Sequence, residues 1–245
     1  MHMENQKKLT GAFALFGKSL TLIRKNLKLY ALIFALEAFA VFTDLLAGDH
    51  PNSNTLQTLS IFLDVTNVLA CVGAAVLNLR VAQGKTPDLS SIFDELGNNW
   101  LWLKLTGFYL MAGVLIVLSL LVFFAPALTA LAVFSTSSLP LPYYLFIPPI
   151  FLAFICILFG WRWFLVPYLL VDKKTKLRES LSESWKMTKG YAWSIWSIFL
   201  VMFLIGLAAL INHFFAVFLI TCYLVAPAIR YEEIKLAKLQ PALNP

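Results

Sequence analysis

The chain has 245 residues, of which 60% are hydrophobic and only 13% are charged. A soluble domain has about 45–50% apolar and about 25% charged residues, so this composition excludes an ordinary soluble protein and is typical of one that crosses a membrane repeatedly. The net charge of +6 does not indicate nucleic acid as a partner, because membrane proteins concentrate Lys and Arg in their cytoplasmic loops.

At about 20 residues per crossing, the length suits roughly six transmembrane helices. We therefore predict an all-α, polytopic membrane bundle that forms a single integral membrane domain over residues 1–245. A separate soluble domain has no room beside six crossings.

Residues 1–28 are polar and basic at both ends and amphipathic in the centre, where Phe13, Phe16, Leu20 and Ile23 recur at helical spacing. This pattern predicts a helix that lies on the cytoplasmic membrane surface. The segment is too long for the basic region of a signal peptide, and the apolar run that follows is long enough to span. We therefore expect an uncleaved anchor.

Six apolar runs predict the crossings, at about 29–47, 56–81, 103–124, 145–171, 192–211 and 214–228. Between the second and third we expect a short amphipathic helix over 89–99, capped by Asp88. Pro126 is expected to kink or end the third crossing. The Asn212-His213 pair is either a tight turn between two crossings or a break in one bent segment.

Basic residues are distributed unevenly among the loops. Of the 19 Lys and Arg, all except Arg162 fall at the two termini or in or directly beside the connections after the second and fourth crossings, whereas the alternate loops contain none. This distribution predicts a multi-pass protein of the cell (cytoplasmic) membrane with both termini on the cytoplasmic side.

The connectors before the first, third and fifth crossings are similar to one another. They read SLTLIRKN, SIFDELGNN and SESWKMTKG, and when they are aligned on their last residues Ile23, Leu96 and Met187 coincide. One interpretation is that any amphipathic connector beside lipid has this pattern. The other is three parallel units, each with a surface helix that leads into a pair of crossings.

The stretch from Trp161 to Gly190 contains WRWF and VP, an acidic turn at Asp172, and then L-x-x-S-x-x-M-x-K-G before an aromatic-led crossing. In this motif the chain resembles a bacterial six-helix membrane family. That family includes the membrane domain attached to some glycerophosphoryl diester phosphodiesterases and several uncharacterised stand-alone proteins. The resemblance implies a fold and a location, and it implies no catalytic residues.

Arg162 is expected near the middle of the membrane, about ten residues or roughly 15 Å inside the fourth crossing. An unpaired arginine there costs at least about 2.5–3.5 kcal/mol. We predict that it pairs with Glu37 of the first crossing, with Asp64 and Asn67 as the next candidates and Asp44 on the same helical face as Glu37. The group is either a charge pair that fixes helix register or an ion, proton or substrate site.

The connector after the fourth crossing is dense in cations that are expected either to determine topology or to contact lipid headgroups or a partner protein. These residues are Lys173, Lys174, Lys176, Arg178, Lys186 and Lys189.

No motif for a metal, a cofactor or a catalytic residue is present. The chain lacks HExxH, GxGxxG and GxxxxGK[ST], and Cys71, Cys156 and Cys222 lie in apolar runs without CxxC spacing. We therefore expect no enzyme activity, metal or cofactor.

Two functions stay open. The first is a non-enzymatic membrane component that binds lipid or a partner protein in envelope homeostasis, with a homo-oligomer or another membrane protein as possible partners and without nucleic acid. The second is a small permease that uses the network of Arg162, Glu37 and Asp64.

Overall fold

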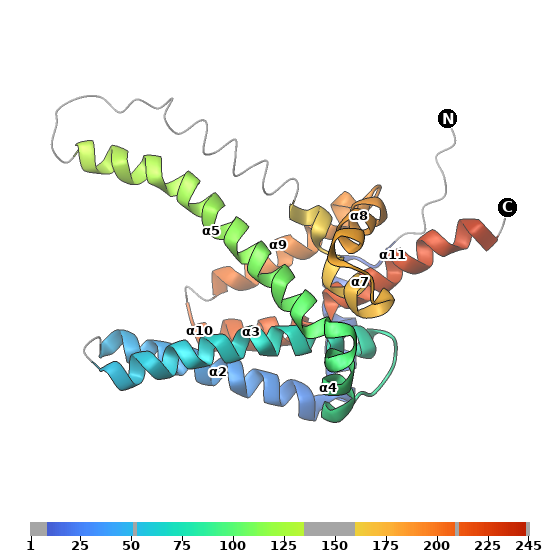
Figure 1. The fold of residues 1–245 in the computed structure, drawn as a ribbon, viewed down its shortest axis with the longest axis horizontal. Coiled ribbons are helices and arrows are strands. Elements are labelled where there is room, and N and C mark those ends of the chain that lie inside the picture. Colours follow the sequence, from blue (N-terminus) through green and yellow to red (C-terminus); the bar gives the residue numbers. More distant parts are fainter. Residues whose placement is uncertain (1–8, 51–52, 135–159, 209–210, 244–245) are drawn as a thin grey trace.

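The computed structural model describes residues 9–50, 53–134, 160–208 and 211–243, and within these ranges the chain forms ten α-helices, two short 3-10 helices and no strand (Figure 1). The helices are α1 (Ala12–Lys25), α2 (Leu27–Asp49), α3 (Asn54–Ala82), α4 (Leu89–Gly97), η1 (Asn98–Trp100), α5 (Leu101–Phe134), η3 (Trp161–Trp163), α7 (Val166–Lys173), α8 (Leu177–Thr188), α9 (Ala192–Ala208), α10 (His213–Tyr223) and α11 (Ala226–Leu243). The predicted all-α class is confirmed.

Several predicted boundaries need correction. The third predicted crossing does not end at Pro126, because α5 continues to Phe134. The sixth divides into α10 and α11 with a break between Tyr223 and Ala226. Most of the fourth, 145–159, lies outside the described residues, and its remainder is broken into η3 and α7.

By length and composition, two helical stretches in the described part of the chain can cross a membrane, Leu27–Asp49 and His213–Leu239. The pair α8 and α9, which bends by 105° between its members, becomes a third if it is counted as one broken span. Length and composition of the described helices thus account for two or three of the six predicted crossings.

Side-chain caps mark the residues at which α4 and α10 begin after their polar connections. The carboxylate of Asp88 accepts from the backbone N–H of Ser91 at 3.0 Å, and Ser91 Oγ accepts from the Asp88 N–H, so the predicted cap of α4 is confirmed. The hydrogen bonds from Ser91 and from Ser90 hold the pKa of Asp88 below its usual value. Asn212 caps α10 in the same way, through Phe215 N–H at 3.0 Å.

The helices fall into three units, each made of a surface helix and the helices that follow it: α1–α3, α4–α7 and α8–α11. Each surface helix packs against the end of the preceding unit, in a cycle. Thus α4 packs on α3, α8 packs on α7, and α1 packs on α10 and α11. Ile23, Leu96 and Met187, which coincide in the sequence alignment, are all buried. This arrangement favours the interpretation as three parallel units.

The last helices of the three units form the core. Helix α3 packs against both α7 and α11, and the rings of Tyr168 in α7 and Tyr231 in α11 lie 5.8 Å apart. Every residue from Val166 to Val171 is buried. The remaining long helices lie around this core: α2 packs on α3 and α10, α5 packs on α3 and α7, and α9 packs on α10, α1 and α11.

The chain bends between α8 and α9 at Gly190, whose φ of +92° is a conformation that residues with a Cβ rarely adopt. We expect Gly190→Ala to cost about 1–2 kcal/mol and to lower the thermal unfolding midpoint in detergent. Gly97→Ala is the matched control, since Gly97 has a φ of −65° and open space around an added Cβ. It should leave the midpoint unchanged or raise it. Equal destabilisation by both substitutions would contradict this account of the bend.

Candidate functional site

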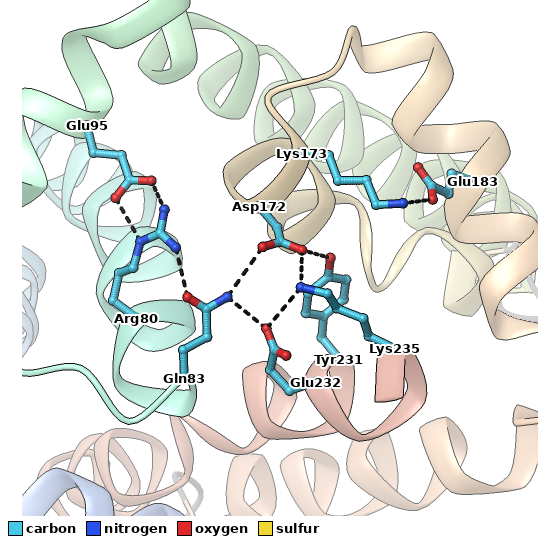
Figure 2. A network of polar contacts seen from close by, with 9 residues as sticks. All are labelled: Arg80, Gln83, Glu95, Asp172, Lys173, Glu183, Tyr231, Glu232 and Lys235. Atoms are coloured by element: carbon cyan, nitrogen blue, oxygen red, sulfur yellow. Dashed lines mark hydrogen bonds and ion pairs between the residues drawn. The ribbon is translucent and has the colours of Figure 1, made fainter. Parts of the chain in front are cut away.

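The C-terminal ends of α3 and α7 meet the middle of α11 at a polar cluster, which we call the three-helix junction: Gln83 directly after α3, Asp172 in α7 and Glu232 in α11 (Figure 2). The Gln83 side chain bridges the other two. Its Nε2 donates to Glu232 Oε1 at 2.8 Å and to Asp172 Oδ1 at 3.4 Å. One side chain from each unit therefore takes part.

Two carboxylates in one cluster repel each other unless a cation lies between them. Lys235 is that cation: its Nζ lies 2.6 Å from Asp172 Oδ2 and 3.8 Å from Glu232 Oε1. The Tyr231 hydroxyl also donates to Asp172 Oδ2, at 2.7 Å. Burial of Asp172 by itself raises its pKa, but the hydrogen bonds from Lys235 and Tyr231 outweigh that effect and leave the pKa below its usual value.

The junction is connected to two surface helices. Arg80 of α3 donates to Gln83 Oε1 at 2.8 Å, and its guanidinium forms a two-pronged ion pair with Glu95 of α4 (Figure 2). Lys173, next to Asp172, pairs with Glu183 of α8. The arrangement contains donors and acceptors that satisfy one another, so it is suited to fixing helices in place.

The cations of the connector after α7 form a basic surface around α8. All six predicted members are exposed: Lys173, Lys174, Lys176, Arg178, Lys186 and Lys189. Lys174 ends α7 in a left-handed conformation, with a φ of +53°. The opposite face of α8 is buried, through Ser180, Ser184 and Met187 among others. The helix is therefore amphipathic in its packing as well as in its sequence.

Arg162 does not pair with Glu37 in the described part of the chain, and this expectation is corrected. Its guanidinium lies over the rings of Trp161 and Trp185, at 4.3 and 4.9 Å, and Nη1 is 3.5 Å from the Trp185 carbonyl oxygen of α8. The sequence estimate of its depth assumed one continuous helix. The chain is instead broken between η3 and α7, so Arg162 lies beside the surface helix α8.

The predicted acidic residues of the first crossing contact its neighbour instead. Glu37 accepts from Asn67 Nδ2 at 3.3 Å, and Asp44 accepts from Ser60, so both carboxylates face α3. The side chain of Asp64 lies outside the described residues. The structure therefore brings Glu37 and Asn67 together but separates both from Arg162.

The described residues contain no group of three His, Cys, Asp or Glu side chains placed to hold a metal ion. Among the cysteines, Cys71 is exposed, Cys222 is buried and Cys156 lies outside the described residues. No family of known proteins matches the chain, and no curated protein or solved structure is detectably similar to it. The resemblance to the six-helix membrane family stays a prediction.

Sequence reasoning missed Gln83, Glu232 and Lys235, and it used Asp172 only as part of a motif. A signal was available, because Gln83, Asp172 and Glu232 each stand at the polar end of an apolar run in an equivalent place of the three units. Their meeting depends on how the units pack.

We expect Asp172→Asn to destabilise the fold by about 1.5–3 kcal/mol, because the neutral amide loses the charge-assisted bond from Lys235. The measurement is the thermal unfolding midpoint in detergent. Asp94→Asn, on the exposed face of α4, is the matched control and should change stability by less than about 0.5 kcal/mol. Similar midpoints for wild type and Asp172→Asn would rule out the junction as a stabilising element.

The lowered pKa of Asp172 determines how the stability difference between wild type and Asp172→Asn depends on pH. A carboxylate with a depressed folded-state pKa stabilises the fold above its unfolded pKa of about 3.9 and loses that contribution as the pH falls toward the folded value. The midpoint difference between wild type and Asp172→Asn should therefore be constant near neutral pH and shrink below about pH 4.

Proposed function

We propose that this chain is a non-enzymatic, multi-pass protein of a bacterial cell membrane, with six crossings and both termini on the cytoplasmic side, whose surface helices bind anionic lipid headgroups. A role in envelope homeostasis and assembly with a second copy or another membrane protein belong to the same proposal. The observations that carry it are the exposed cations of helices α1 and α8, together with exposed aromatic side chains on α1, α4 and α8.

The exposed apolar surface supports several crossings. Large apolar side chains are exposed along α2 and α10, which belong to the two stretches long and apolar enough to span, and also along α3, α5 and α9. A soluble protein rarely exposes apolar patches of this extent, whereas lipid tails are a suitable environment for them. Examples are Phe39, Phe62, Leu110, Phe203 and Phe218.

Exposed aromatic residues on and beside the surface helices support a position at the membrane interface. Phe13 in α1 is 79% exposed, Phe93 in α4 is 67% exposed, and Trp193 at the start of α9 is 87% exposed. Trp side chains concentrate at the boundary between headgroups and tails, where an apolar ring and a polar N–H are both accommodated. Trp100 and Trp102, which follow α4, are also exposed.

The cations of the α8 surface support anionic headgroups as the ligand. A Lys or Arg close to an anionic membrane contributes about 1 kcal/mol to binding. Since Arg178 and Lys186 are exposed on a helix whose other face is packed on the core, they are available to lipid. The permease hypothesis receives less support, because its central cation Arg162 lies away from Glu37.

The test uses the purified chain in vesicles that contain brominated phosphatidylglycerol or brominated phosphatidylcholine, which quench the seven Trp residues on contact. We expect phosphatidylglycerol to be enriched around the wild type. The double variant Arg178→Gln, Lys186→Gln should reduce this enrichment by about fivefold per charge removed, because each charge contributes about 1 kcal/mol.

Ser182→Gln is the control, because Ser182 is exposed on the same helix and its replacement removes no charge. High salt should also reduce the enrichment, as it screens exposed charges. Equal quenching by the two lipids would exclude headgroup binding by this surface. An enrichment that is unchanged in the double variant would exclude it as well.

A further inference from the structure

We propose that a hollow beside the N-terminus of α9 binds the phosphate-bearing headgroup of an anionic phospholipid. The proposal rests on the lipid-binding function above and adds one discrete site to it. The hollow has a volume of about 400 Å³, and its walls are the segment 9–12, the turn at Gly190, the first turns of α9 and Arg230 of α11.

A buried arginine with an unused donor lines this hollow. The side chain of Arg230 is 1% exposed, Nη1 donates to Glu233 Oε2 at 3.0 Å, and Nη2 donates to the Thr10 carbonyl oxygen at 2.5 Å. Its Nε has no hydrogen-bond partner among the described residues. Buried donors in folded proteins nearly always have a partner, so this one indicates a group that binds here.

The first turn of α9 provides a second set of donors. Helix α9 has 17 residues and begins at Ala192, and Trp193 and Ser194 of its first turn line the hollow. The first N–H groups of a helix have no partner within the helix and carry a partial positive charge, so they favour an anion.

The surrounding charges also favour an anion. Lys18 lies 3.3 Å from Glu233, the carboxylate that also pairs with Arg230. Lys238 lies over the ring of Tyr191, which lines the hollow, at 6.0 Å. Arg230 and Lys18 therefore share one carboxylate, and Lys238 adds a third cation beside the hollow, which leaves a positive excess.

A phospholipid fits this position better than a free phosphate ion. The hollow lies where the chain bends by 105° from the surface helix α8 into the apolar helix α9. Ser197 lines the hollow, and Leu200, Leu204 and Leu207 follow it on the same face of α9 and are exposed. A headgroup in the hollow thus places its acyl chains along an apolar stripe.

The test is a titration of the purified full chain by native mass spectrometry in detergent, with short-chain phosphatidylglycerol, short-chain phosphatidylcholine and inorganic phosphate as separate probes. Ser194→Phe fills the hollow without removing Arg230 or its partners. Ser197→Phe is a second blocking variant, and Ser182→Phe on the exposed face of α8 is the matched control.

We expect the wild type to bind phosphatidylglycerol more tightly than phosphatidylcholine, and both blocking variants to weaken that binding by at least about tenfold, or about 1.4 kcal/mol. The control should bind as the wild type does, and inorganic phosphate should not displace the lipid. Unchanged affinity in a folded blocking variant would overturn the site. Displacement by inorganic phosphate at equal concentration would overturn the assignment to lipid.

The two proposals fail separately. If the Arg178 and Lys186 variant reduces lipid enrichment while the blocking variants leave the titration unchanged, the hollow is not a lipid site and the basic surface is. The reverse pattern would establish the hollow and contradict the wider surface.

Discussion

The carboxylate of Asp172 is the group on which the arrangement of the three units depends. It stands in the last turn of α7, after six consecutive buried apolar residues, where the unpaired carbonyl groups of the helix already give a partial negative charge. A carboxylate is unfavourable there unless donors surround it. Gln83, Tyr231 and Lys235 supply them from the two other core helices.

This requirement explains why the surface helices have defined positions. The groups that satisfy Asp172 are connected to α4 through Arg80 and Glu95, and its neighbour Lys173 is connected to α8 through Glu183. The amphipathic helices are therefore fixed to the core by polar bonds at one end of the bundle. The exposed cations of α8 and the exposed aromatic rings of α4 and α8 therefore have fixed positions relative to the core, which is what the proposed selective binding of headgroups requires.

The local features were predictable from sequence, and the contacts between distant segments were not. Apolar runs predicted helices, and Asp88 predicted the start of α4, because periodicity and caps depend on neighbouring residues. The pairing of Arg162 with Glu37 was wrong in the described structure, because a residue count along the chain does not detect the break between η3 and α7. Pro126 likewise did not end α5.

The contacts of Gln83, Glu232 and Lys235 were also not predictable from the sequence. Each is an ordinary polar residue at the end of an apolar run, and only the cyclic packing of the units brings them to Asp172. The weak repeat among the connectors contained this information, since it predicts equivalent positions for the polar ends of the three apolar runs. The basic cluster after α7 was easier to find, because its density is visible in the sequence.

The most direct test of the three-helix junction is to measure on which side of the membrane the C-terminal ends of α3 and α7 lie. Single cysteines at Lys85, Arg178 and Ser53, in a chain without its native cysteines, are treated with a membrane-impermeant maleimide in intact and in permeabilised cells. The account predicts that Ser53→Cys reacts in intact cells, while Lys85→Cys and Arg178→Cys react only after permeabilisation. Labelling of Lys85→Cys and Arg178→Cys from opposite sides would contradict it, because the two helix ends would then be unable to meet.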